Sequence, residues 1–128
     1  KQLLIKTNNS KSEEERLIQI EKEISFLSRL KKIKAVYLEG PSFSSSGAFV
    51  LQMGALHFLI RLFLYKKNIE YKIIPPGSLK KFVTGTGAAK KELILLKVYK
   101  RWGVEFDDNN LADAYSLARM ALEENIHE

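Results

Sequence analysis

Apolar residues recur at helical and strand-like spacings along the chain. From residue 13 to about residue 31 they return every three or four positions, which predicts a helix with one buried face. Ser10 and Ser12 each precede a glutamate by three positions, a pattern typical of a helix N-terminus. Residues 33–38 (IKAVYL) are rich in β-branched and aromatic side chains and run into Glu39-Gly40-Pro41. They predict a strand that carries a carboxylate at its carboxyl end.

Residues 48–67 predict a helix that is apolar on nearly every side. Such a helix must be covered on more than one face. It follows a serine-rich loop at residues 41–47. Four residues interrupt its apolar run, so we expect a poor membrane span: Gln52, Gly54, His57 and Arg61.

A second strand is predicted at residues 70–74, closed by Pro75-Pro76-Gly77. Ser78 is expected to cap a brief helix that runs through Val83. The sequence Gly85-Thr86-Gly87 resembles a phosphate-binding loop, but a single GxG is a weak signal. A simple helix-breaking turn is the favoured interpretation.

Two further helices complete the pattern. Residues 88–102 form one, which ends at Gly103. Asn109 or Asn110 is expected to cap the last helix, whose apolar spacing continues to about Glu124.

The order of elements predicts an α/β fold with at least two parallel strands. The chain has 128 residues, a length that fits one domain. Two strands are too few for a stable sheet. Residues 1–5 (KQLLI) read as a strand entered midway, so we expect N-terminal strands upstream of this chain.

Composition restricts the chemistry. Cysteine is absent and there are two histidines, so a metal ion would be held by oxygen ligands. Net charge is +6, and it is unevenly distributed. Residues 72–101 carry 8 Lys/Arg and 1 Asp/Glu, whereas residues 102–128 carry 1 and 7. A basic segment beside an acidic one suits a protein that cuts phosphodiesters, although solvated helix faces explain the same pattern. No signal peptide is visible, and we expect a cytoplasmic protein.

Two carboxylates are the candidates for chemistry. Glu39 lies where a strand ends, at the rim on which open α/β sheets keep their sites. Asp113 lies one turn inside the last helix, beside its apolar stripe, where a charge needs a partner or a cation. A solvent-exposed glutamate, and an aspartate that stabilises the helix macrodipole, remain the alternatives.

Four ordered segments resemble RuvC-type Holliday junction resolvases, especially their phage and prophage relatives. They span residues 33–121, about two-thirds of the chain, and their order and spacing carry the resemblance: VYLEG at 36–40, the apolar helix after SSGAF, IIPPGSLKKFVTGTGAAKKEL at 73–93, and RWGVEFDDNNLADAYSLA at 101–118. The resemblance implies a ribonuclease H-like fold, a mixed sheet flanked by helices, whose N-terminal strands lie outside this chain.

The resemblance also implies a set of metal ligands. Glu39 matches the ligand on the central strand, and Asp113 matches a ligand on the last helix. Asn110 occupies the position three before Asp113, where relatives usually carry Asp or His. An amide brings no charge, so Asp107 or Asp108 would supplement it. The first-strand Asp has no counterpart here, and activity requires that upstream sequence supply it.

The implied function is Mg²⁺-dependent cleavage of branched DNA such as a four-way junction, with Mn²⁺ able to substitute. Lys80 and Lys91 match positions near the scissile phosphate, and Lys81 and Lys90 are expected to contact the DNA backbone. Phe43 follows Glu39 in a loop where aromatic residues of the family wedge into a junction. Ordinary solvation of each lysine, and core packing of Phe43, remain open.

Other residues have simpler expected roles. Phe49 and Trp102 are assigned to the core, His57 to a packed or interface position, and His127 to solvent. The helix at residues 48–67 is expected to form a two-fold dimer interface, since relatives pair through this helix and a four-way junction has two-fold symmetry. Packing of that helix wholly within one domain is the alternative.

Two other functions fit the same residues. One is a different ribonuclease H-like nuclease, with the same metal ions and another substrate. The other is a catalytically impaired DNA-binding module of the same fold, which Asn110 makes possible. A purely structural interaction domain is disfavoured by the basic segment at residues 72–101.

Overall fold

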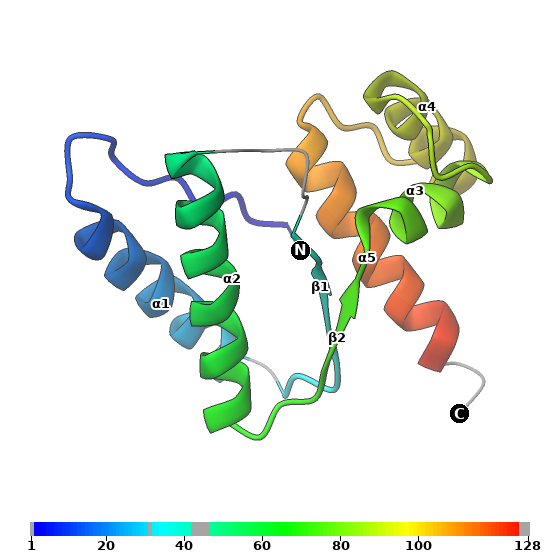
Figure 1. The fold of residues 1–128 in the computed structure, drawn as a ribbon. Helices are drawn as coiled ribbons and strands as arrows, with labels where there is room; N and C mark the ends of the chain where they lie inside the picture. The colour runs from blue at the N-terminus through cyan, green and yellow to red at the C-terminus, as the bar shows by residue number, and fades with distance from the viewer. Residues whose placement is uncertain (1, 31, 42–46, 126–128) are drawn as a thin grey trace. The chain divides into compact units, whose positions relative to one another are not determined.

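The structure is a computed structural model that describes residues 2–30, 32–41 and 47–125. Helices and strands alternate along the first part of the chain, and helices alone follow (Figure 1). In order, these elements are α1 (Glu13–Leu30), β1 (Val36–Glu39), α2 (Ala48–Lys66), β2 (Tyr71–Ile74), α3 (Pro76–Thr84), α4 (Lys91–Trp102) and α5 (Asn109–Asn125).

The two strands form a small parallel sheet. The amide of Val36 donates to the carbonyl of Glu70, and that of Gly40 donates to the carbonyl of Ile74. Both strands advance in the same direction between these bonds, so the pairing is parallel as predicted.

No strand forms at residues 2–5, and the prediction of a strand there is wrong for the described residues. This segment leads into contacts with the following helix instead. The side chain of Gln19 donates to the carbonyl of Lys6, and Arg16 donates to the hydroxyl of Thr7.

The chain divides into two compact units. The carboxylate unit consists mainly of residues 37–40 and 72–125, and the two-helix unit consists of the described parts of residues 4–36 and 41–71. Each is described by itself.

A single apolar core holds the carboxylate unit together. Trp102, predicted to belong to the core, packs against it, with its ring 6.0 Å from Phe82 and 5.8 Å from Tyr115 between centroids. Side chains from β2, α3, α4, α5 and the loop before α4 build its centre: Ile74, Leu79, Val83, Ala89, Ile94, Val98, Leu117 and Met120.

Two helices of this unit begin at residues other than those predicted. α3 begins at Pro76, ahead of Ser78, because proline has no N–H to leave unpaired in the first turn. α4 begins at Lys91, not Ala88. The predicted ends are confirmed, since Gly85 and Gly103 terminate α3 and α4 in the left-handed conformation. The sequence Gly85-Thr86-Gly87 is thus a helix-breaking turn.

In the two-helix unit, α1 and α2 lie side by side (Figure 1). The hydroxyl of Ser12 accepts from the amide of Glu15 at 3.1 Å and caps α1 as predicted. His57 is buried and packs edge-on against Phe58, which confirms a packed histidine. Its burial, with a contribution from Arg61, lowers its pKa.

Most of α2 is exposed within this unit. His57 and Leu64 are its buried residues, and Phe49 is 56% exposed, so the prediction that Phe49 belongs to the core is wrong. By length and composition alone α2 could cross a membrane, since an 18-residue window has a mean hydropathy of 1.6. Length and composition therefore do not support the expectation of a poor span.

Candidate metal centre

Glu39 ends β1 at the carboxyl edge of the sheet, as predicted. The next residue, Gly40, is buried, and its amide donates to the carbonyl of Ile74 at 2.8 Å. A Cβ atom at Gly40 would lie 3.3 Å from Cγ2 of Ile73 and 3.4 Å from the carbonyl oxygen of Ile74. The absence of a side chain at Gly40 lets the two strands approach closely where the carboxylate is presented.

Asp113 is placed by the way α5 begins. Oδ1 of Asp108 accepts from the amide of Leu111 at 3.1 Å, so Asp108 caps the helix, and the prediction of an Asn109 or Asn110 cap is wrong. The adjacent residue Ala112 is fully buried. This burial fixes the rotation of the helix and leaves Asp113 half-buried at the edge of the core.

The structure brings Glu39 and Asp113 close enough to affect each other. Partial burial raises the pKa of Glu39, the charge of Asp113 raises it further, and Lys80 lowers it. Burial also raises the pKa of Asp113, while Lys80 and Lys91 lower it. Two carboxylates 74 positions apart in the sequence thus share one electrostatic environment with two lysines.

The four predicted lysines divide into two pairs. Lys80, half-buried on α3, acts on both carboxylates, and Lys91, the first residue of α4, acts on Asp113. Lys81 and Lys90 are exposed, and neither contributes to the pKa shift of either carboxylate. Phe43 lies outside the described residues, as does His127.

Asn110 lies on α5 one turn before Asp113, on the same side of the helix, and is exposed. Of the two aspartates expected to supplement it, Asp108 is engaged in the helix cap, whereas Asp107 is exposed. Among residues 2–30, 32–41 and 47–125, no three His, Cys, Asp or Glu side chains gather closely enough to hold a metal ion.

The donor set nevertheless fits a hard divalent cation. Oxygen ligands are those that Mg²⁺ and Mn²⁺ prefer. Burial disfavours the charged forms of both Glu39 and Asp113, and the charge of Asp113 adds to the effect on Glu39; a cation between the two carboxylates would offset these effects. Two carboxylates leave room for further ligands.

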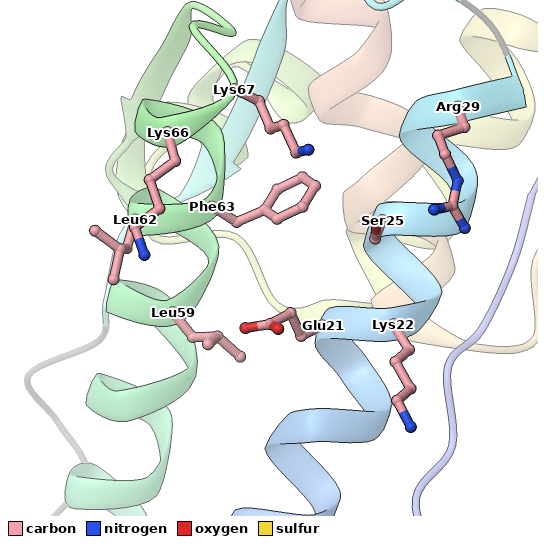
Figure 2. A pocket seen from close by; sticks show the side chains of 9 residues that line it. All are labelled: Glu21, Lys22, Ser25, Arg29, Leu59, Leu62, Phe63, Lys66 and Lys67. Carbon is pink, nitrogen blue, oxygen red and sulfur yellow. The ribbon is translucent and has the colours of Figure 1, made fainter.

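A groove lies elsewhere, between α1 and α2 (Figure 2). Its volume is about 580 Å³, and the ring of Phe63 points from α2 toward α1. Neither Glu39 nor Asp113 lines it. Its basic side chains belong to the two-helix unit: Lys22, Arg29, Lys66 and Lys67. The groove and the carboxylate pair are therefore separate features.

Comparison with known proteins identifies the fold. Two structures of Thermus thermophilus RuvC superimpose on the chain, one with a TM-score of 0.74 at 21% identity and one, in complex with Holliday junction substrate, with a TM-score of 0.76 at 22% identity. They cover 91% and 88% of this chain, which in turn covers 76% and 70% of them. The chain has the RuvC fold. The predicted ribonuclease H-like class is confirmed.

A curated relative supports the same conclusion from sequence. The crossover junction endodeoxyribonuclease RuvC of Ehrlichia canis (strain Jake) is 28% identical over 116 residues, which are 90% of this chain and 74% of the relative. No family model matches the chain. The resemblance to RuvC inferred from four ordered segments is confirmed.

The sequence analysis missed three residues that lie on the site's strands and helix. Tyr37, Lys72 and Glu124 form a polar cluster that joins β1, β2 and α5 of the RuvC-like sheet and helix. The available signal was spacing, because Tyr37 lies two residues before Glu39 and Glu124 lies 11 residues after Asp113. Spacing within each element does not predict that Tyr37 on β1 contacts Glu124 on α5.

Proposed function

We propose that this protein is a metal-dependent endonuclease that hydrolyses phosphodiester bonds in four-way branched DNA. The observation that carries the proposal is the pairing of Glu39 with Asp113 beside Lys80, on a RuvC fold. Two similar proteins support this choice of substrate, since one is a crossover junction endodeoxyribonuclease and the other was solved with Holliday junction substrate.

Glu39 and Asp113 would hold divalent cations, with Mg²⁺ the proposed ion and Mn²⁺ a substitute. When bound, these cations supply Lewis-acid stabilisation of the attacking and leaving oxygens of the phosphodiester. Partial burial keeps the two carboxylates from being fully hydrated, which strengthens their attraction for a cation. Asn110 would add a neutral oxygen, and an aspartate from upstream sequence would complete the set.

The lysines would act on the DNA. Lys80 lies within electrostatic reach of both carboxylates, so its ammonium can neutralise a phosphate held at the same place. Lys91, near Asp113, would act from the other side. Lys81 and Lys90 are exposed and would contact the backbone farther from the reacting bond, and Phe43 would contact unpaired bases.

A cleavage assay tests the proposal. The full protein, incubated with Mg²⁺ and a synthetic four-way junction, should nick strands at the junction. Glu39→Gln and Asp113→Asn should each lower the rate by on the order of 10²-fold or more, because each removes a charged ligand. Glu70→Gln, an exposed glutamate of the two-helix unit, is the matched control and should retain the activity.

Asn110 favours a second candidate, a DNA-binding module that has lost cleavage. The same assay separates the two. A protein that binds the junction tightly in a gel-shift experiment, yet cuts neither with Mg²⁺ nor with Mn²⁺, would be the binding module. Asn110→Asp would then be expected to increase metal affinity by restoring a charged ligand.

We also propose that the protein pairs with a second copy through α2. Its exposed apolar residues follow a spacing of four and three, which is the seam of paired helices: Leu51, Ala55, Phe58, Leu62 and Tyr65. Phe58 is 62% exposed and Leu51 is 74% exposed, an amount of apolar surface that favours a partner. A symmetric dimer would present two sites to a two-fold symmetric junction.

Sedimentation equilibrium at micromolar concentration measures this pairing. The full protein should sediment as a dimer, and Phe58→Glu should shift it toward monomer, because a charge would enter the seam. A monomer across this range, before any substitution, would rule the pairing out. We further propose that the protein acts in the cytoplasm, with the apolar surface of α2 covered by protein and not by lipid.

A further inference from the structure

A polar cluster joins the two strands to the C-terminal end of α5. The hydroxyl of Tyr37 on β1 donates to Oε2 of Glu124 on α5. Nζ of Lys72 on β2 lies 3.1 Å from the same oxygen. The ammonium also lies 5.6 Å from the centre of the Tyr37 ring. Each of the three side chains therefore interacts with both of the others.

Two residues of the cluster lie on the same elements as the proposed metal ligands, β1 and α5. Tyr37 precedes Glu39 by two residues, so both side chains lie on one side of β1. Glu124 follows Asp113 by 11 residues, close to three full turns, so both lie on one face of α5. The two positions on the helix are separated by about 16 Å along its axis.

Leu117 and Met120 occupy that face of α5 between Asp113 and Glu124. Both are buried in the core with Ile74 of β2. Apolar contacts pack α5 against the core, but they are not directional. Hydrogen bonds depend on direction and distance, so the cluster supplies a constraint that the core contacts lack.

We propose that the Tyr37–Lys72–Glu124 cluster is a positioning device for the metal centre. It fixes the rotation and axial position of α5 against the strands, so that Asp113 stays at the distance from Glu39 that metal ligation requires. None of the three side chains touches metal or substrate, and the inference rests on the proposed function for what the two carboxylates bind.

The exposure of the cluster makes this role separable from stability. The side chains of Lys72 and Glu124 are 57% and 44% exposed, and pairs this exposed contribute little to folding. The neighbouring pair of Arg101 with Glu123 provides a control, because it is similarly exposed and ties the same end of α5 to α4 instead of the strands.

The test compares Tyr37→Phe with Glu123→Gln in the full protein. Tyr37→Phe removes only the hydroxyl and keeps the ring. Calorimetric titration with Mn²⁺ should give an affinity up to about tenfold weaker for Tyr37→Phe, which loses one hydrogen bond to a charged group, and an unchanged affinity for Glu123→Gln. Lys72→Met should weaken Mn²⁺ binding, whereas Lys72→Arg, which keeps the charge, should bind Mn²⁺ like the parent protein. The urea midpoints of both variants should remain close to that of the parent protein.

Equal Mn²⁺ affinities for Tyr37→Phe and Glu123→Gln would overturn the positioning role. If the parent protein binds no Mn²⁺, the proposed function fails, and a metal-free measurement judges the positioning role separately. In ¹H–¹⁵N spectra without metal, the amide resonance of Asp113 should move in Tyr37→Phe and stay in place in Glu123→Gln. An unmoved resonance in both variants would overturn the inference whatever the metal result.

Discussion

The carboxylate unit has a buried apolar core, whereas the apolar side chains of the two-helix unit lie largely on the surface. Among the described residues, every buried apolar side chain except Leu64 belongs to the carboxylate unit. Val98 has no exposed surface there, while Leu51 on α2 is 74% exposed. The helix with the most apolar sequence is therefore not the centre of the core.

The contrast shows what each unit is suited to do. Metal ligands must be held in place, and a closed core around α5 holds Asp113 at its edge. An exposed apolar seam does not hold a site, but it is suited to pairing with another helix. The four predictions that follow test this division, beginning with the largest expected effect.

A charge placed in each unit should have opposite consequences. Val98→Asp should destabilise the protein by at least about 4 kcal/mol, because an unpaired carboxylate would enter a closed core. Leu51→Asp should change the unfolding free energy by less than about 0.5 kcal/mol, since the site is exposed. Urea denaturation at low protein concentration measures both, and similar losses would contradict the contrast.

Divalent metal should stabilise the protein only through the carboxylate unit. At a metal concentration about 100 times the dissociation constant, the unfolding free energy should rise by about 2.7 kcal/mol. Asp113→Asn should abolish most of this increase, because a ligand is lost, and Glu70→Gln should retain it. Thermal unfolding with and without Mg²⁺ checks the result. An equal increase in Asp113→Asn would remove that residue from the site.

Lysines in the two units should differ in their effect on cleavage. Lys80→Ala should slow cutting of a four-way junction by about tenfold, since its charge acts at both carboxylates. Lys66→Ala, on the rim of the α1–α2 groove, should slow it less than about twofold. Rates measured at saturating DNA separate this effect from affinity, and equal losses would indicate a general effect of charge.

The smallest effect concerns pH. Glu39 and Asp113 have raised pKa values, so in metal-free buffer the folded protein holds more protons than the unfolded chain above about pH 4. As pH rises from about 4 through the raised pKa values of the two carboxylates, their contribution to the unfolding free energy falls. Glu39→Gln removes one of these charges and should raise the metal-free Tm at pH 7 relative to the parent, with the difference vanishing near pH 4. A Tm difference independent of pH would contradict this origin.

Patterns of spacing predicted the elements well where the pattern is local. The helix at residues 48–67, the strand ending at Glu39 and the glycine stops at Gly85 and Gly103 all follow from nearest neighbours in sequence. Helix starts were less predictable, because several adjacent residues are able to cap. Asp108 caps α5 although Asn109 and Asn110 are equally competent.

Burial and side-chain contacts between distant segments were not predictable from spacing. Phe49 is as apolar as any core residue, yet it is 56% exposed. The pairing of Glu39 with Asp113 was anticipated through a family resemblance, not through periodicity. The contact between Tyr37 and Glu124 joins residues 87 positions apart, and their identities alone do not determine it.

The close packing around Gly40 limits which residues evolution can place beside Glu39. Any side chain there would have to displace Ile73 or the backbone of Ile74 by a few tenths of an ångström, at the residue adjoining the carboxylate. Catalytic groups must be held within about 0.5 Å of their productive geometry, so a shift of this size beside Glu39 affects the site directly. A lineage that kept cleavage would thus conserve glycine at this position, whereas a lineage that had turned to DNA binding alone would be free to lose it. Sequences of descendants at position 40 would therefore record whether cutting was retained.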